Sequence, residues 1–201
     1  ELDILGYVIS FCEAIQFAHE NGVYHRDIKP QNVLLYNGVV KVSDFGLSRF
    51  VSRDTTTITN TDMKAGTQGY MPPEFNNGVF KKGTIEGDVY MIGKTLYYMF
   101  SHGKDVSNVR FESVPLQIYS IIDKCTKNEP DQRYSSVDTI ATELKKYKNL
   151  LIEADNAPKT IDEIKAAYNV NTPQFNKEVF KTLNILGNNS KDWGYVLRQL
   201  S

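Results

Sequence analysis

The chain is short of the residues that mark several classes of protein. Its 201 residues include two cysteines and one tryptophan, and its 23 lysines and arginines nearly balance 24 aspartates and glutamates. Without a positive surplus there is no overall field to recruit nucleic acid or an anionic membrane. The most apolar stretch, residues 89–100, is interrupted by Lys94 and is shorter than the roughly 20 apolar residues of a membrane span. We therefore expect a globular protein without nucleic-acid or membrane partners.

The cysteines and the first residue give two further expectations. Cys12 and Cys125 both fall on the apolar face of a helical pattern, which disfavours a disulfide framework or a cysteine zinc site. Reduced, buried thiols fit a cytoplasmic location best. The sequence starts at Glu1 rather than Met and carries no leader-like pattern there, so we expect it to begin inside a longer protein.

Apolar periodicity predicts a mainly helical fold with one small β-hairpin. Apolar residues recur every three or four positions along residues 5–19, and this pattern ends at Asn21-Gly22. Residues 88–100 are apolar on almost every side, which is typical of a helix surrounded by protein. Further helices are predicted at residues 116–125 and 137–147, and a hairpin at residues 33–35 and 39–42 around Asn37-Gly38.

Two other regions are less regular. Residues 44–80 lack a sustained period and contain a threonine-rich run, so they are predicted to form a long surface loop. Beyond residue 150, repeated helix-start chemistry predicts three short helices, at residues 160–169, 173–186 and 191–200. Residues 149–201 are accordingly expected to be a helical extension of unknown role.

The residues that carry chemistry are concentrated between positions 24 and 46. His25-Arg26-Asp27 is followed by Asn32, five positions after the aspartate, and then, beyond the predicted hairpin, by Asp44-Phe45-Gly46. Each motif alone is weak. Their order and spacing together resemble the catalytic loop and the Asp-Phe-Gly motif of the eukaryotic-like Ser/Thr protein kinase family. The resemblance covers residues 1–148 and implies the C-terminal, larger lobe of the kinase fold.

Phosphoryl transfer explains why these residue types occur together. A carboxylate such as Asp27 can orient a nucleophilic hydroxyl and accept its proton. Magnesium prefers oxygen ligands, so the Asp44 carboxylate and the Asn32 amide oxygen suit ions that bridge ATP phosphates. Lys29 can place a positive charge on the transferring phosphoryl group. The resemblance therefore implies ATP and magnesium as cofactors, a protein substrate, and a place for Leu34 at the nucleotide.

Further along, residues 66–74 look like the peptide-binding segment of the family. The resemblance implies that Thr67 bonds near Asp27 and that Glu74 pairs with a buried arginine, for which Arg133 is the match. The sequence around Asp88 looks like the family's central helix, whose aspartate braces the backbone of the catalytic loop.

The histidines and the threonine-rich run have separate interpretations. By resemblance, His25 is a scaffold residue that stacks with Phe45, whereas we expect His19 and His102 at the surface without a role. Arg26 directly before the proposed base is similar to kinases whose activation segment is ordered by phosphorylation. The candidate phosphosites are Thr55, Thr56, Thr57, Thr59 and Thr61. A plain solvated linker is the alternative for this run.

The resemblance leaves out the smaller kinase lobe. None of the 13 glycines forms Gly-x-Gly-x-x-Gly, and no strand with a nucleotide-clamping lysine precedes the catalytic loop. We expect the same parent chain or a second chain to supply that lobe, and the isolated chain to be inactive. The lobe-facing apolar residues Val33, Leu34, Leu35 and Phe45 would then be exposed and promote self-association.

Three classes of function stay open. The leading one is a Ser/Thr kinase catalytic lobe that transfers the γ-phosphate of ATP to protein hydroxyls in its full-length parent. The main alternative is a kinase-derived, non-catalytic module that binds or regulates a protein partner. A small-molecule phosphotransferase is disfavoured, because residues 66–74 look shaped for peptides.

Overall fold

The computed structural model describes residues 2–45, 49–50, 67–77 and 83–156. The chain divides into two compact units, Glu1–Tyr147 and Lys148–Ser201, and of the second only the last part of one helix is described. The helices are α1 (Leu2–Glu20), α2 (Ile85–Phe100), α3 (Leu116–Cys125) and α4 (Val137–Asn156). The strands are β1 (Val23–Tyr24), β2 (Val33–Tyr36), β3 (Val39–Val42) and β4 (Arg49–Phe50). Short 3-10 helices occupy Pro30–Asn32, Pro73–Asn77, Phe111–Ser113 and Pro130–Gln132. A helix-rich fold with two small antiparallel strand pairs agrees with the sequence-based expectation.

Helix α1 confirms the first helical prediction and extends it by one turn at its start. Its apolar stripe is buried, with Leu5, Phe11, Cys12 and Ile15 fully shielded from solvent. The helix ends at Asn21-Gly22, where the Gly22 amide bonds back to the His19 carbonyl and Gly22 adopts a positive φ of 70°.

Strands β2 and β3 form the predicted hairpin. Val33 pairs with Val42 and Tyr36 with Val39 in antiparallel register. The two turn residues, Asn37 and Gly38, have φ angles of 51° and 76°, the pair of positive values that a two-residue hairpin turn requires. This hairpin immediately follows the short helix that carries Asn32.

The prediction of an irregular loop over residues 44–80 was wrong in two places. Strand β4 pairs antiparallel with β1, joining Val23 to Phe50 and Tyr24 to Arg49. A 3-10 helix spans Pro73–Asn77. A two-residue strand has too few positions to show a period, and its pairing depends on β1, which lies far away in sequence. Gly46 and the candidate phosphosites Thr55, Thr56, Thr57, Thr59 and Thr61 lie outside the described residues.

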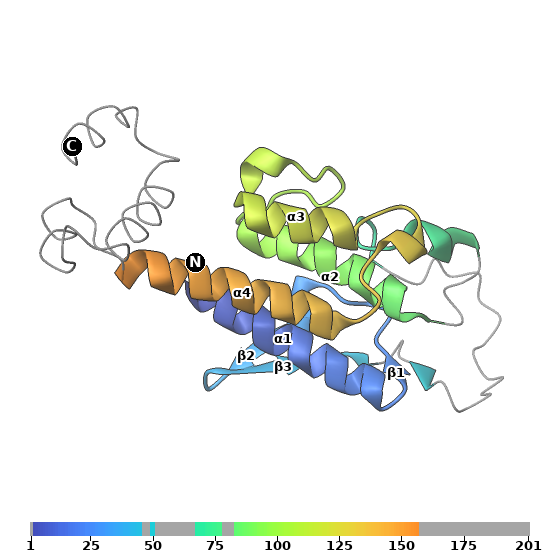
Figure 1. Cartoon of the computed structure of the whole chain (residues 1–201). Coiled ribbons are helices and arrows are strands. Elements are labelled where there is room, and N and C mark those ends of the chain that lie inside the picture. Colours follow the sequence, from blue (N-terminus) through green and yellow to red (C-terminus); the bar gives the residue numbers. More distant parts are fainter. Residues whose placement is uncertain (1, 46–48, 51–66, 78–82, 157–201) are drawn as a thin grey trace, which may run out of the picture. The chain divides into compact units, whose positions relative to one another are not determined.

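Helix α2 is the centre of the first unit, as its all-round apolarity predicts. It begins three residues earlier than expected because the Thr84 hydroxyl caps it, accepting a hydrogen bond from the Gly87 amide. It contacts α1 and packs alongside α3, as Figure 1 shows. The close approach to α3 depends on Gly93, where an added Cβ would lie 2.5 Å from Cys125 Cβ.

The remaining predicted helices are also present, and α4 continues beyond its predicted end. The Ser136 hydroxyl accepts a hydrogen bond from the Thr139 amide at the start of α4. Cys12 and Cys125 are both free and buried, as expected. Among the described residues, no helix combines the length and apolarity needed to traverse a bilayer. The three short helices predicted after residue 157 lie outside the described part of the chain.

Candidate active site

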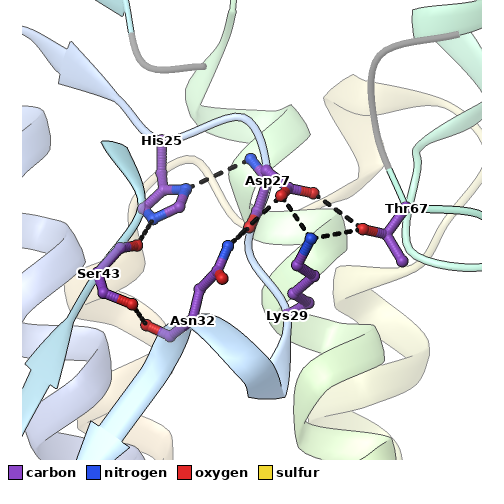
Figure 2. A network of polar contacts seen from close by, with 6 residues as sticks. All are labelled: His25, Asp27, Lys29, Asn32, Ser43 and Thr67. Carbon is purple, nitrogen blue, oxygen red and sulfur yellow. Dashed lines mark hydrogen bonds and ion pairs between the residues drawn. The ribbon is translucent and has the colours of Figure 1, made fainter. Parts of the chain in front are cut away.

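The side chains of Asp27, Lys29 and Thr67 meet in one hydrogen-bonded cluster (Figure 2). Lys29 Nζ donates to Asp27 Oδ2 at 2.7 Å and to Thr67 Oγ1 at 2.8 Å. The Thr67 hydroxyl in turn donates to Asp27 Oδ1 at 3.1 Å. A carboxylate that accepts a charge-assisted bond on one oxygen and a neutral one on the other is held in a fixed orientation. The three residues that the sequence singled out, 40 positions apart at most, are therefore in contact.

Asn32 joins this cluster through its amide nitrogen. Asn32 Nδ2 donates to the backbone carbonyl of Asp27 at 2.8 Å and lies 3.4 Å from Asp27 Oδ2. These bonds distinguish the amide nitrogen of Asn32 from its amide oxygen. They leave Asn32 Oδ1 without a hydrogen bond to another described residue. An oriented amide oxygen with a free lone pair is a suitable ligand for a hard cation. The donor chemistry therefore fits magnesium.

Asp44 lies close to the cluster in sequence but forms no hydrogen bond with it. Its neighbour Ser43 is tied to the Asn32 carbonyl through both its amide, at 2.9 Å, and its hydroxyl, at 3.3 Å. The Asp44 carboxylate is exposed and makes no polar contact with another described residue. Asp44 also has a φ of 59°, a left-handed conformation that aspartate adopts more readily than bulky residues. An exposed carboxylate offers oxygen donors of the kind that a hard cation binds.

His25 supports the cluster from behind. Its Nδ1 accepts from the Asp27 amide at 3.3 Å, so its Nε2 carries the proton and donates to the Ser43 carbonyl at 3.0 Å. The imidazole also packs against Phe45, with ring centroids 4.6 Å apart. His25 is fully buried, and both of its ring nitrogens are hydrogen-bonded. This geometry matches the expected scaffold position, and it links the loop that carries Asp27 to the segment that carries Asp44 (Figure 2).

Asp88 of α2 holds the backbone of the same loop. Its two carboxylate oxygens accept from the amides of His25 and Arg26, each at 2.8 Å, and the carboxylate is fully buried. Arg26 is itself buried and has a φ of 70°, an unfavourable conformation for a long side chain. Two charge-assisted bonds to adjacent amides offset that cost, so Asp88 fixes the path of the chain into Asp27.

The expectation that His19 is a surface residue was wrong. Its side chain is 3% exposed, and its Nε2 lies 2.8 Å from Asp88 Oδ2. His19 Nε2 thus contacts the same carboxylate oxygen that accepts the His25 amide. The sequence did hold a signal for this position, because Cys12, Ile15 and His19 follow one another at spacings of three and four on the buried face of α1.

Glu74 and Arg133 form a second fixed point, at the far end of the segment that starts with Thr67. The guanidinium donates to both Glu74 oxygens, at 2.6 and 2.8 Å. Its other three N–H groups bond the backbone carbonyls of Glu86, Lys127 and Asn128. All five donors of a fully buried guanidinium are therefore satisfied.

Two tyrosines beside this segment remain neutral hydroxyls. Burial raises the pKa of Tyr70 to about 12, and the neighbouring Tyr98 adds to the shift. Burial also raises the pKa of Tyr90, an effect that Arg133 partly opposes. Both side chains are therefore uncharged at neutral pH.

Three of the four apolar residues expected to face the smaller lobe, Val33, Leu34 and Leu35, line a hollow beside the hairpin, and Phe45 does not. Leu34 and Leu35 are 48% and 54% exposed, and Phe45 is 40% exposed. The hollow has a volume of about 260 Å³ and is lined by Ile4, Tyr7, Val8, Val33, Leu34, Leu35, Val40 and Met99. It offers apolar contacts without a charged group.

Comparison with known proteins places these features in a family. Residues 2–150 match the model of the protein kinase domain. A relative named a probable serine/threonine-protein kinase, from Clostridium acetobutylicum, is 29% identical over 172 residues, which are 76% of this chain and 26% of the relative. The serine/threonine-protein kinase PknB of Mycobacterium tuberculosis is 28% identical over 172 residues, 76% of this chain and 27% of its own length.

A shorter and more similar stretch occurs in the probable serine/threonine-protein kinase PknB of Corynebacterium glutamicum, at 41% identity over 91 residues, which are 45% of this chain and 14% of the relative. The chain thus spans about a quarter of the length of the first two of these curated relatives. The family model covers well over half of the chain, and its position coincides with the cluster around Asp27. The chain therefore belongs to the protein kinase domain family.

Proposed function

We propose that residues 1–148 are the larger lobe of a Ser/Thr protein kinase, which in its complete form transfers the γ-phosphate of ATP to a protein hydroxyl. The observation that carries the proposal is the Asp27 cluster. In it, the nearly buried Asp27 carboxylate is held in a fixed orientation, with the Lys29 ammonium 2.7 Å away. Residues 149–201 are a helical extension of unknown role.

Each side chain of the cluster has a chemical task in this proposal. Asp27 orients the acceptor hydroxyl and takes its proton as the oxygen attacks phosphorus. Lys29 balances charge on the transferring group, and Thr67 keeps Asp27 and Lys29 in place. Asn32 Oδ1 and the Asp44 carboxylate would hold magnesium, which would neutralise phosphate charge. Leu34 contributes apolar contact to the nucleotide.

The exposed hollow beside the hairpin supports the view that this lobe works with another body. Leu34, Leu35 and Phe45 give an apolar surface that water-exposed domains rarely leave open. We propose that the nucleotide and the smaller kinase lobe cover it, the lobe coming from the same parent chain or in trans. Alone, the chain would bury this surface by self-association, so a Leu35→Glu variant would shift it toward monomer in light scattering at high concentration. A wild-type chain that is monomeric there would contradict this part.

Regulation by phosphorylation is a further part of the proposal. Five threonines at positions 55–61 follow the Asp44 segment, and Arg26 directly precedes the proposed base. A phosphate near an arginine forms strong charge-assisted bonds and can order a segment. Mass spectrometry of active protein should find phosphate between residues 44 and 74. Active protein without phosphate there would remove this part and leave the catalytic assignment intact.

Transfer of radioactive phosphate from ATP to a protein acceptor tests the function. In the complete protein, Asp27→Asn should abolish transfer and leave nucleotide binding in place, because Asn keeps the shape and cannot accept the proton. Asp44→Asn should instead weaken magnesium-dependent nucleotide binding. The isolated chain should transfer nothing, since clamping of ATP is a large part of the catalysis. Full activity of the Asp27→Asn protein would overturn the assignment.

The alternative is a non-catalytic module that binds a protein partner through the Thr67–Glu74 segment. The exposed apolar hollow, a second surface that contains no residue of this segment, is the observation in its favour, because a partner protein could cover it as well as a nucleotide. Partner capture that is unchanged in the Asp27→Asn protein, together with no transfer in the complete wild-type protein, would favour this alternative.

A further inference from the structure

Lys94 is a buried cation on the central helix, outside the cluster around Asp27. The residue is 7% exposed, although a lysine ammonium is strongly hydrated in water. Burial lowers the pKa of Lys94, and the charge of the exposed Asp105 opposes that shift. An apolar side chain would occupy this position at lower cost, so the contacts of the ammonium show what it provides in return.

The ammonium holds the linker between α2 and α3. Lys94 Nζ donates to the Val106 carbonyl at 2.7 Å, and this bond is buried. The Val106 side chain packs under the Thr67–Glu74 segment at Gly69, where an added Cβ would lie 3.0 Å from Val106 Cγ2. Gly69 belongs to the turn that the Tyr70 amide closes on the Thr67 carbonyl, at 3.1 Å. Lys94 is thus connected to Thr67 through one carbonyl, one packed side chain and one turn.

The same ammonium is connected to the other end of that segment. Lys94 Nζ lies 5.6 Å from the centroid of the Tyr90 ring, one helical turn earlier on α2. The Tyr90 ring also faces Arg133, whose Cζ lies 4.9 Å from its centroid. Arg133 in turn holds Glu74 with two hydrogen bonds. Cations at this range from an aromatic ring are attracted to it.

We propose that Lys94 is a positioning residue for the protein substrate, one that fixes the floor beneath the Thr67–Glu74 segment without touching the reactants. The proposal rests on the proposed kinase function. The Lys94 ammonium bonds the Val106 carbonyl, which leads to the Thr67 end of the segment. It also faces the Tyr90 ring, which contacts Arg133 at the Glu74 end. Removing the ammonium frees the linker and loosens the surface that a peptide meets, while the bonds among Asp27, Lys29 and Asn32, which do not involve the segment, remain.

Kinetics of the complete protein test the proposal first. Lys94→Met keeps length and removes the charge and the bond to Val106. We expect the KM for a protein or peptide substrate to rise about fivefold, because peptide binding is weakened. The kcat and the KM for ATP should stay nearly unchanged, because the chemical step is not affected. Val106→Ala, which keeps the carbonyl and removes the contact with Gly69, should shift the same constant. Lys146→Met, which removes an exposed cation paired with Glu143, is the matched control and should change none of them.

Hydrogen–deuterium exchange of the 201-residue chain gives a readout that does not need activity. Lys94→Met should speed exchange about tenfold in residues 67–75 and 104–110 and leave α1 unchanged, because only the linker and the segment lose an anchor. Uniformly faster exchange, or a fall in kcat with an unchanged peptide KM, would overturn the positioning role. If the complete protein shows no transfer at all, the proposed kinase function fails, and local exchange still decides whether Lys94 anchors the segment.

Discussion

Glutamine in place of Glu74 would test how the end of the Thr67–Glu74 segment is fixed to the rest of the lobe. The substitution keeps the shape of the side chain and removes its charge, so Arg133 keeps its three carbonyl partners and loses the carboxylate. The Arg133 side chain is fully buried, and that of Glu74 is 15% exposed. Stranding one partner of a buried pair typically costs about 3–5 kcal/mol, and the retained carbonyl bonds and partial exposure place Glu74→Gln near 3 kcal/mol, about the lower end of that range.

Urea denaturation of the chain at neutral pH measures this cost. The matched control is Asp123→Asn, which breaks the exposed pair between Asp123 and Lys127, whose side chains are 46% and 41% exposed. Such a pair on a helix surface is worth about 0–0.5 kcal/mol. A double-mutant cycle with Arg133→Met isolates the pair itself, with a coupling energy of about 2 kcal/mol expected for neighbours in one network. If Glu74→Gln costs no more than the control, the segment is held by other contacts and the reasoning is refuted.

Three further changes give separate tests by the same unfolding measurement. Gly93→Ala gains about 1 kcal/mol of helix propensity but places a Cβ 2.5 Å from Cys125 Cβ and 2.8 Å from Thr126 Cγ2. The overpacking costs about 1–3 kcal/mol and should exceed this gain, so the variant should be less stable. A stabilised variant would contradict this. Burial raises the pKa of the Cys12 thiol from 9.0 to about 12, so the folded chain keeps a proton that the unfolded chain releases above about pH 9. Stability should therefore fall as pH rises, by about 2 kcal/mol near pH 10.5 from this thiol, and Cys12→Ala should flatten that slope; an unchanged slope would exclude the thiol as its source. Asp88→Asn replaces one of two acceptors of the loop amides by a donor and should cost about 1.5–3 kcal/mol, and a cost near zero would mean that the loop does not depend on this brace.

Much of the fold could be predicted because it depends on neighbours in sequence. The apolar stripe of α1, the all-round burial of α2 and the hairpin turn at Asn37-Gly38 all follow from spacing over a few residues. Strand β4 could not be found in this way, since a two-residue strand has no period and exists only beside β1. His19 illustrates the same limit. Its position on the buried face of α1 could be read from local spacing, but its partner Asp88 lies 69 residues away and could not.

For the candidate site, the sequence by itself determined which chemical groups are present and in which order. It placed a carboxylate, an ammonium and an amide within Asp27–Asn32, and a second carboxylate at Asp44 after the hairpin. Only the tertiary structure decided which of these groups touch: the Asp27 bond to Thr67 spans 40 positions, and the Glu74 bond to Arg133 spans 59. The physical reason is that local spacing sets which face of an element is buried, whereas a bond between distant residues depends on how α1, α2 and the connecting segments pack. In the sequence, Lys94 only interrupts an apolar stretch. Because of the same packing, its buried ammonium is hydrogen-bonded to the Val106 carbonyl.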